Sequence, residues 1–318
     1  MDTNDAGPKT LLEAVRYFAD PQVAHDFFVE QRWPHGVTCP TCGSPDVTYL
    51  PAYRRWLCKE QHERRQFSAK VGSIFEDSPL GFDKWLPAMW MLLNCKNGVS
   101  SYEIGRALGI TQKSAWHMLH RLRLVVKTGS FDKLMGDVEA DETFIGGKAR
   151  FMHRDKRAAK ITGTGGMNKT AVMGLLERHG PGTKTRRVRV KVIGSRRKRE
   201  LQAEVRQHVE PGANLYTDAL ASYEGLAPDY AHQVIDHAES YVRGKVHTNG
   251  LENFWSLLKR AIRGTYVNVE PFHLFRYLDE QAFRFNERHD NDGGRFLKAI
   301  RSATGKRLMY KTLIAKPA

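Results

Sequence analysis

Three carboxylates that lie far apart in the chain, those of Asp141, Asp218 and Glu252, could together bind two divalent cations. Carboxylate oxygens are hard ligands that suit Mg²⁺, with Mn²⁺ as an effective substitute. Two such ions roughly 3.5–4 Å apart can activate a water or a 3′-hydroxyl and stabilise the leaving oxygen in an in-line attack on phosphorus. These residues therefore predict phosphoryl transfer, provided that the fold brings them together.

Glu252 lies in the segment 247–260, HTNGLENFWSLLKR, which predicts one amphipathic helix. At about 100° per residue its apolar residues form one face and its polar residues an adjoining stripe. Glu252 and Lys259 fall nearly in line on that stripe, so a cation two turns beyond the carboxylate could meet a phosphate. Taken alone, such a stripe is more often the salt-bridged surface of a packed helix.

The elements that must position these residues begin after about residue 130, where the pattern predicts strands alternating with helices. We expect strands over 137–147, 170–176, 187–193, 214–217 and 233–236, and helices over 196–209, 247–260 and 270–287. This order is typical of the ribonuclease-H-like fold. There, a central strand, its neighbour and a later helix each present a carboxylate, in this chain Asp141, Asp218 and Glu252.

The pattern leaves open which acid of the first strand belongs to the site. Side chains alternate along a strand, so Asp137, Glu139 and Asp141 point to one side and Glu142 to the other. Asp141 is nearest the turn and is our preferred candidate. Asp218 could instead serve as an N-cap after its strand.

Three of the four cysteines and one histidine, Cys39, Cys42, Cys58 and His62, form the pattern Cys-x2-Cys-x15-Cys-x3-His. Two such pairs joined by a hairpin-length spacer supply four ligands for tetrahedral zinc. The spacing predicts a zinc ribbon with a structural Zn²⁺, because all four positions are filled. Cys95 is expected in the core of an apolar helix over 85–95, the alternative being that it replaces His62.

A helix-turn-helix is predicted over residues 100–122. A helix over 102–108 leads through Gly109 to Thr111, which can N-cap a second helix. The N-terminal residues of that second helix would read bases in a DNA major groove. Its expected outward residues are Gln112, Lys113, His117, His120, Arg121 and Arg123. The alternative is a plain helical hairpin in a bundle.

The formal net charge of +15 over 318 residues favours a polyanionic partner through counterion release. Residues 150–200 hold 16 lysines and arginines against three acids, so most of the net charge lies in one sixth of the chain. We expect a nucleic-acid track there rather than a membrane-binding face. Its residues would be Arg186, Arg187, Arg189 and Lys191 on a strand, and Arg196, Arg197, Lys198 and Arg199 at the next helix.

Other classes of protein are disfavoured. No apolar run approaches 18 residues and no signal peptide is visible, so we expect a cytoplasmic chain without a membrane-spanning helix. The glycine-rich stretch 162–166 lacks the Gly-Lys-Ser/Thr ending of a phosphate-binding loop. We interpret it as a basic loop and expect no nucleotide cofactor.

With these motifs the chain resembles the DDE-type transposases of bacterial insertion sequences, in particular the ISXO2-like type with an N-terminal zinc ribbon. The resemblance rests on VEADETFIGGK at 138–148, YTD at 216–218 and HTNGLENFWSLLKR at 247–260. It covers nearly the whole chain from residue 40 onward. The third segment is the most specific, because Glu and Lys seven positions apart recur in such transposases.

The resemblance implies that Asp141, Asp218 and Glu252 ligate the metals and that Lys259 contacts DNA near the scissile phosphate. In some members Asn takes the third position, so Asn249 is an alternative to Glu252. Asn249 and Arg260 are also expected DNA contacts. His62 departs from the family, whose fourth zinc ligand is often Cys. The implied partners are double-stranded DNA, as terminal inverted repeats and target, and further copies of the chain.

We therefore expect an α/β multidomain chain. Its parts would be a helical lead-in (1–35), a zinc ribbon (36–70), a helix-turn-helix DNA-binding region (71–130), a ribonuclease-H-like DDE catalytic domain (131–290) and a basic C-terminal tail (291–318). The expected function is DNA transposition in a bacterial cell, associated with the nucleoid through DNA. The alternatives are a non-catalytic zinc-ribbon regulator, a domesticated transposase that has lost activity, and a nuclease or resolvase of the same fold.

Overall fold

The computed structural model describes residues 7–127, 132–147, 153–161, 169–178, 186–235 and 247–315. The chain divides into two compact units, Met1–Lys127 with Asp290–Ala318, and Thr128–His289. No helix in the described ranges is long and apolar enough to cross a membrane. The glycine-rich stretch 162–166 lies outside these ranges, as do residues 148 and 236.

The first unit opens with two capped helices. Thr10 accepts a hydrogen bond from the amide of Glu13 to start α1 (Leu11–Phe18), and Asp20 caps α2 (Pro21–Arg32) in the same way. Their buried aromatic side chains pack against one another and against rings from later elements of the unit. The rings of this cluster are Phe18, Phe27, Phe28, Phe75, Phe82 and Phe296.

A small antiparallel sheet follows, with strand order β1-β2-β3. Its strands are β1 (Val47–Leu50), β2 (Arg55–Cys58) and β3 (Gln66–Ser68). The expected hairpin is therefore present, and it ends at Cys58. Trp56 on β2 is buried and stacks on Phe67 of β3, a cross-strand aromatic pair that stabilises such a short sheet.

Three helices complete the N-terminal part, namely α3 (Phe82–Asn94), α4 (Ser101–Leu108) and α5 (Gln112–Val125). Ser100 and Glu103 form a capping box at the start of α4, and Gly109 ends it at φ +63°. Thr111 caps α5 as expected, by accepting from the amide of Ser114. The two predicted helices are thus joined by a glycine turn.

The C-terminal segment, which we expected to be a basic tail, contains α10 (Asp292–Arg301) and α11 (Tyr310–Ile314). On α10, Phe296, Ala299 and Ile300 are buried. This spacing of three and four residues forms an apolar face on one side of a helix. The Phe296 ring lies 5.2 Å from the Trp90 ring of α3, so α10 contributes to the core of the first unit.

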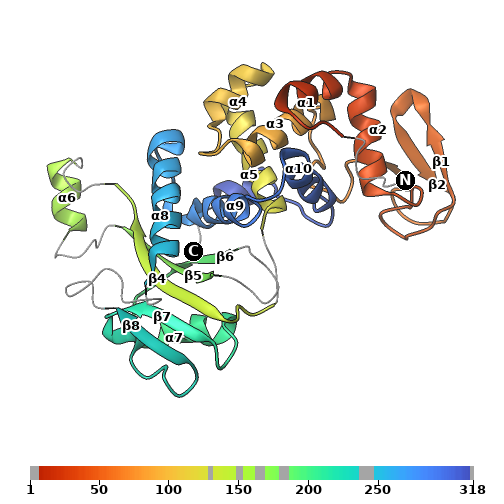
Figure 1. The fold of residues 1–318 in the computed structure, drawn as a ribbon. Coiled ribbons are helices and arrows are strands. Elements are labelled where there is room, and N and C mark those ends of the chain that lie inside the picture. The colour runs from red at the N-terminus through yellow and green to blue at the C-terminus, as the bar shows by residue number, and fades with distance from the viewer. Residues whose placement is uncertain are drawn as a thin grey trace. The chain divides into compact units, whose positions relative to one another are not determined.

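The second unit contains a five-stranded sheet in the order β6-β5-β4-β7-β8 (Figure 1). Strands β4, β5 and β6 are antiparallel neighbours, whereas β7 and β8 run parallel to β4. All five strands were expected. Their bounds are β4 (Asp137–Ile145), β5 (Thr170–Glu177), β6 (Arg187–Ile193), β7 (Asn214–Asp218) and β8 (Ala231–Ile235).

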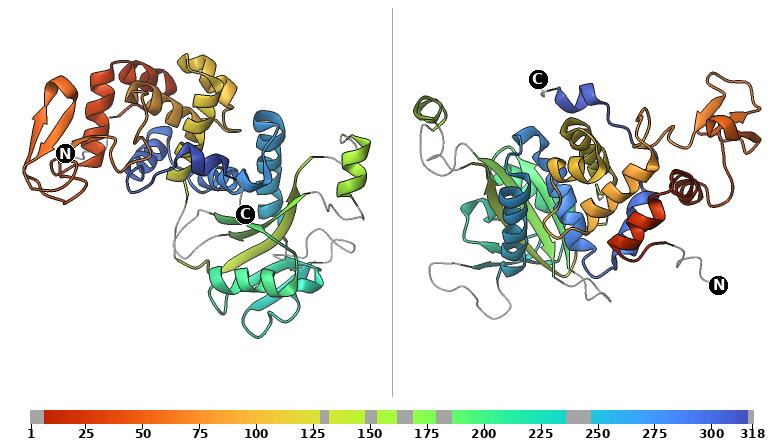
Figure 2. Two further views of the ribbon diagram at one scale, coloured as in Figure 1. Left: turned by 180° about the vertical axis from the view of Figure 1, so that it is seen from behind. Right: turned by 90° about the horizontal axis from the view of Figure 1, so that it is seen from above.

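Helices cover both faces of this sheet (Figures 1 and 2). Helix α7 (Lys198–His208) packs on one face through Leu201 and Val205. Helices α8 (Asn249–Ala261) and α9 (Leu274–Asn286) pack on the other, where they share a core with alternate residues of the strands. Helix α6 (Arg154–Lys160) lies between β4 and β5 in the chain.

The packing of α8 requires a residue without a side chain at Gly174 of β5. A Cβ there would lie 2.7 Å from Cζ2 of Trp255 and 2.8 Å from Cδ2 of Leu251, much closer than carbon atoms approach. Gly174 is the registered partner of Asp141 on β4. The glycine therefore lets α8 approach the sheet beside the proposed site.

We predict that Gly174→Ala lowers the free energy of unfolding by about 1–3 kcal/mol, because overpacking moves Trp255 and Leu251. The measurement is urea unfolding followed by circular dichroism. Gly264→Ala is the matched control, because its added Cβ meets nothing within 4 Å. Equal stability of the two variants would contradict this account of the packing.

Candidate active site and zinc site

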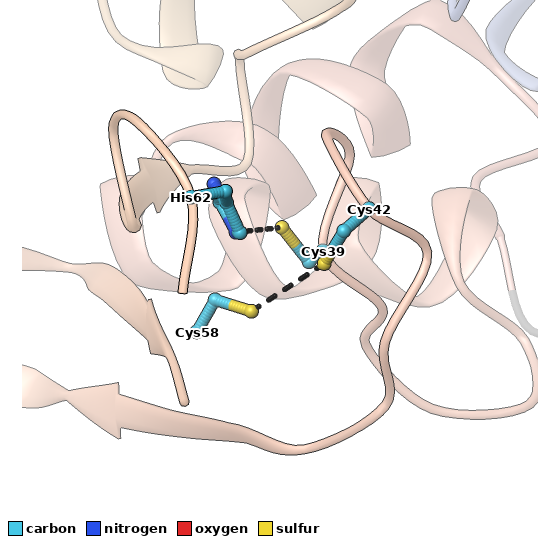
Figure 3. A group of neighbouring side chains, drawn as sticks. All are labelled: Cys39, Cys42, Cys58 and His62. Atoms are coloured by element: carbon cyan, nitrogen blue, oxygen red, sulfur yellow. Dashed lines mark hydrogen bonds between the residues drawn. The ribbon is translucent and has the colours of Figure 1, made fainter. Parts of the chain in front are cut away.

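The four predicted zinc ligands converge in the first unit, as Figure 3 shows. Sγ of Cys42 lies 3.6 Å from Sγ of Cys58, and Sγ of Cys39 lies 3.4 Å from Nε2 of His62. All four ligand atoms lie within 4.8 Å of one another. Tetrahedral zinc with bonds of about 2.0–2.3 Å separates its ligand atoms by roughly 3.5–3.8 Å, so the cluster fits this ion.

Backbone hydrogen bonds fix the turn between Cys39 and Cys42 and the orientation of the His62 ring. Gly43, at φ +77°, turns the chain after Cys42 so that its amide donates to the carbonyl of Cys39 at 2.8 Å. Nδ1 of His62 lies 2.7 Å from the carbonyl oxygen of Glu63. A carbonyl only accepts, so Nδ1 must carry the proton, which leaves the Nε2 lone pair facing the cluster.

Electrostatics favour a thiolate at Cys39. Burial acts against ionisation, but hydrogen bonds from the amides of Cys42 and Thr41 lower the pKa of the Cys39 thiol to about 6. The thiolate is the form that binds zinc. Cys95 follows directly after α3 and does not belong to the cluster, so the structure favours His62 over Cys95 as the fourth ligand.

We expect one equivalent of zinc in the purified protein and its loss in Cys42→Ser, with unfolding of the ribbon, because a sheet of this size has little core of its own. Zinc is measured by atomic absorption and unfolding of the ribbon by the change in intrinsic tryptophan fluorescence, to which Trp56 of β2 contributes. Cys95→Ser is the control and should retain zinc. Full zinc content in Cys42→Ser would contradict the assignment.

The first two predicted acids lie at corresponding points of neighbouring parallel strands. Glu139 of β4 pairs with Tyr216 of β7, and Asp141 and Asp218 each follow two residues later. Because the strands are parallel and in this register, both residues lie at the same level along the two strands, just beyond their last paired residues. Asp218 also accepts a hydrogen bond from the amide of Leu220 at 3.2 Å, which is a local turn contact.

Alternation along β4 separates its acids, as expected. The Asp141 side chain points toward α8, where it accepts a hydrogen bond from Nε1 of Trp255 at 2.9 Å. Glu142 points to the opposite face and accepts from the hydroxyl of Tyr223. Asp137, which was also considered, accepts from Asn214 on β7 at 2.8 Å.

The third acid is on the first turn of α8. Glu252 is exposed, three residues before the Trp255 that contacts Asp141. Burial raises the pKa of Asp141 to about 6, and the negative charges of Asp218 and Glu252 add to this shift. The structure thus places Asp218 and Glu252 each within electrostatic reach of Asp141. Among the described residues, however, the zinc ligands are the one group of three or more possible metal ligands whose ligand atoms all lie within 4.8 Å of one another.

An open groove of about 570 Å³ joins this site to the cations of α8. Asp141 and Glu252 line it together with Lys259. The pKa of Lys259 is lowered, because burial and the charge of Arg263 outweigh the opposing effect of Asp141. Lys259 is half-buried, whereas Arg260 and Arg263 are exposed. The full lining is Asp141, Glu142, Thr143, Glu252, Trp255, Ser256, Lys259, Arg260 and Arg263.

Sequence reasoning did not assign Glu142 and Tyr223 to the site. Burial, followed by the charges of Asp218 and Asp141, raises the pKa of Glu142 to about 7, and burial raises that of Tyr223. Glu142 also lines the groove. The position of Glu142 directly after Asp141 could have indicated it, but we assigned the site to the opposite face of β4 because side chains alternate along a strand.

The basic residues expected to bind DNA fall into two groups in the second unit. On β6 they pair locally, since Arg187 donates to Glu177 at 2.8 Å and Lys191 pairs with Glu204. Arg189 also has local partners, in the ring of His208 and the carbonyl of Asp132. The residues at the start of α7, namely Arg196, Arg197, Lys198 and Arg199, are exposed, and Arg196 lies over the Phe144 ring of β4.

The helix α5 departs from the expected outward arrangement. Gln112 and Lys113 are exposed as expected, and Asn249 on α8 is exposed too. His120, Arg121 and Arg123 are buried, so the expectation that they face outward is wrong. The Arg121 guanidinium lies over the Trp85 ring and donates to the carbonyl of Glu76.

His117 is half-buried for a related reason, because its Nε2 lies 3.3 Å from the carbonyl oxygen of Leu308. Its ring packs on Tyr310. The C-terminal segment thus covers this part of α5, which the helical periodicity of α5 alone could not indicate. Only the first turn of α5 keeps the exposed polar surface that base contacts would need.

Comparisons with known proteins identify the family. Residues 133–286 match the ISXO2-like transposase domain, and residues 20–62 match the transposase zinc-ribbon domain. The chain is 27% identical over 259 residues to an uncharacterised protein in transposable element ISH50 of Halobacterium salinarum, covering 77% of this chain and 84% of the relative. It is 31% identical over 83 residues to an uncharacterised transposase-like protein of Haemophilus influenzae, covering 26% of this chain and 67% of that relative.

The chain therefore belongs to the ISXO2-like family of insertion-sequence transposases, as the motifs predicted. The zinc-ribbon match ends at His62, so it includes all four clustered ligands. The transposase-domain match spans β4 to α9 and includes Asp141, Asp218 and Glu252.

The raised pKa of Asp141 gives a stability prediction. An unfolded aspartate ionises near pH 4, whereas burial raises the folded pKa to about 6. The folded state therefore holds the proton longer, and stability is lost as the pH rises through this window, by about 2–3 kcal/mol in all. In buffer without divalent ions, Asp141→Asn should unfold at a higher temperature than the wild type at pH 8, and the difference should shrink toward pH 5.

Calorimetry at pH 5, 6, 7 and 8 measures this difference. Asp229→Asn, which removes an exposed partner of Arg206, controls for general loss of negative charge. A constant difference between Asp141→Asn and the wild type across this range would contradict the assignment of the titration to Asp141.

Proposed function

We propose that this chain is a DDE-type transposase that cleaves double-stranded DNA at the terminal inverted repeats of its element and joins the ends to target DNA. The observation that carries the proposal is the arrangement of three carboxylates beside a basic groove. Asp141 and Asp218 follow matched positions of parallel strands, and Glu252 shares the groove with Asp141 and Lys259. Family membership supports it.

The proposed catalytic domain has a ribonuclease-H-like fold. Its support is the strand order β6-β5-β4-β7-β8, with three antiparallel strands followed by two strands parallel to β4. The helix α8 then carries the third proposed acid, Glu252, which lines the same groove as Asp141. The helix pair α4–α5, with its glycine turn, is proposed as a helix-turn-helix that contacts DNA through Gln112 and Lys113.

The donor set suits Mg²⁺ or Mn²⁺, since every proposed ligand is a carboxylate oxygen. Bound ions would activate the attacking water or 3′-hydroxyl and neutralise charge on the leaving oxygen. The amide of Glu142 and the indole of Trp255 each donate to a different oxygen of Asp141. Both oxygens keep a further lone pair, so these contacts orient the carboxylate without excluding a metal.

The cations of α8 and of the π-helical turn that follows it, Ile262–Tyr266, would hold the DNA. Lys259 lines the groove two turns beyond Glu252, where it can meet the phosphate to be cleaved, and Arg260 and Arg263 can meet its neighbours. Arg196, Arg197 and Lys198 are exposed at the start of α7, where they could contact further phosphates. Action on paired DNA ends requires more than one copy of the chain, so we propose a homo-oligomer that acts in the cytoplasm at the nucleoid.

The test is incubation of the zinc-loaded protein with labelled terminal-repeat DNA and Mg²⁺. We expect Asp141→Asn, Asp218→Asn and Glu252→Gln each to reduce cleavage by at least about 1000-fold with DNA binding retained, since metal-assisted catalysis depends on these ligands. Lys259→Met should slow cleavage less. Asp229→Asn should cleave normally.

The alternatives have distinct outcomes in the same assay. A nuclease or resolvase of this fold would cleave but form no joined product with target DNA. A non-catalytic regulator would bind the repeats with no cleavage by the wild type. If Glu252→Gln cleaves normally and Asn249→Ala does not, the third ligand is Asn249.

A further inference from the structure

The carboxylate of Glu139 is almost completely buried next to the proposed site and has no role in the mechanism above. Its side chain is 1% exposed, and it lies two residues before Asp141 on the same face of β4. Burying a charge is costly unless it is paired and hydrogen-bonded. The contacts of this carboxylate therefore indicate what it does.

One oxygen of Glu139 binds the start of α8. Oε2 accepts a hydrogen bond from the amide of Leu251 at 2.9 Å. That amide lies in the first turn, where helix amides have no partner within the helix, and the N-cap residue Thr248 supplies no side-chain hydrogen bond. A carboxylate at a helix N-terminus is also favoured by the helix dipole. Glu139 thus replaces a local cap, from a strand 112 residues away in the chain.

The other oxygen is paired with Arg178, which follows β5 and is 7% exposed. Nε of Arg178 donates to Oε1 of Glu139 at 2.7 Å. The guanidinium also donates to the carbonyl of His247, just before α8, and lies 3.0 Å from its Nδ1. The same pair therefore fixes the chain on both sides of the helix start.

Gly250 makes this approach possible. A Cβ at Gly250 would lie 2.8 Å from Oε2 of Glu139 and 3.0 Å from Cδ2 of Leu176. Alanine is normally the better helix former, so glycine in this turn is explained by the close approach of the carboxylate. Glu252 is the next residue but one.

We propose that Glu139, Arg178 and Gly250 form a clamp that positions Glu252 relative to Asp141, so that the two carboxylates can share bound metal. The clamp residues do not themselves ligate the metal. Together with the hydrogen bond from Trp255 to Asp141, they attach α8 to β4 at two points on either side of Glu252. This inference rests on the proposed function.

The direct test is Mn²⁺ binding to the zinc-loaded, full-length protein without DNA, followed by the electron paramagnetic resonance of free Mn²⁺. Glu139→Gln keeps the size of the side chain and an acceptor for Leu251 but removes the charge. We expect its Kd for Mn²⁺ to rise about 10-fold, as is typical when a residue that orients a metal ligand is lost. The Mn²⁺ concentration for half-maximal cleavage should rise in step, and excess Mn²⁺ should restore cleavage.

A buried ion pair of the same kind provides the control. Glu280 and Arg284 on α9 are 1% and 9% exposed and contact each other, but neither lines the groove. Glu280→Gln should lower the melting temperature by a similar amount and leave Mn²⁺ binding unchanged. A purely structural role for Glu139 predicts that the two variants behave alike.

Gly250→Ala is the second variant in case Glu139→Gln fails to fold. It preserves every charge and should still raise the Kd for Mn²⁺, whereas Gly264→Ala should not. Wild-type Mn²⁺ binding in a folded clamp variant would overturn the clamp but leave the proposed function intact. No Mn²⁺ binding and no cleavage by the wild type would overturn both.

Discussion

The second unit depends on holding like-charged carboxylates close together on the neighbouring inner strands β4 and β7. Burial raises the pKa of Asp141 and of Glu142, and the charge of Asp218 adds to both shifts. The acids therefore cannot supply the contacts that hold them in place. Neighbouring groups do so instead: the indole of Trp255 for Asp141, the hydroxyl of Tyr223 for Glu142, and the apolar packing of α8 at Gly174. The surrounding core offsets an arrangement that is unfavourable by itself.

Much of this could be predicted from the sequence, because the signals were local. Alternation along β4 correctly separated Asp141 from Glu142, and the order of the five strands with α7, α8 and α9 matched the expected one, whereas α6 was not expected. The spacing of the cysteines was equally informative, since two short pairs joined by a hairpin leave few arrangements other than a shared centre. The N-cap at Thr111 correctly marked the start of α5.

What the sequence did not reveal depends on contacts between distant segments. Arg121 has the periodicity of an exposed residue, yet it is buried between Trp85 and the carbonyl of Glu76. Likewise, the sequence of α10 suggested a basic tail, but in the structure its Phe296 packs against rings of α1, α2 and α3. Glu139 was one of three candidate acids on β4, and only its contact with an amide 112 residues later distinguishes it.

The basic residues of the chain are not equally available to a polyanionic partner. A net charge of +15 predicts a polyanionic partner, but composition does not distinguish paired cations from exposed ones. On β6, Arg187 and Lys191 are paired with buried or half-buried acids, so those contacts must be exchanged before they can meet a phosphate. Arg260 at the end of α8 and Arg263 in the π-helical turn Ile262–Tyr266 are exposed and line the groove that holds Asp141 and Glu252. In the proposed site, α8 therefore carries both the third carboxylate, that of Glu252, and the groove cations Lys259 and Arg260, so one helix would set both the metal ligand and the contact with DNA.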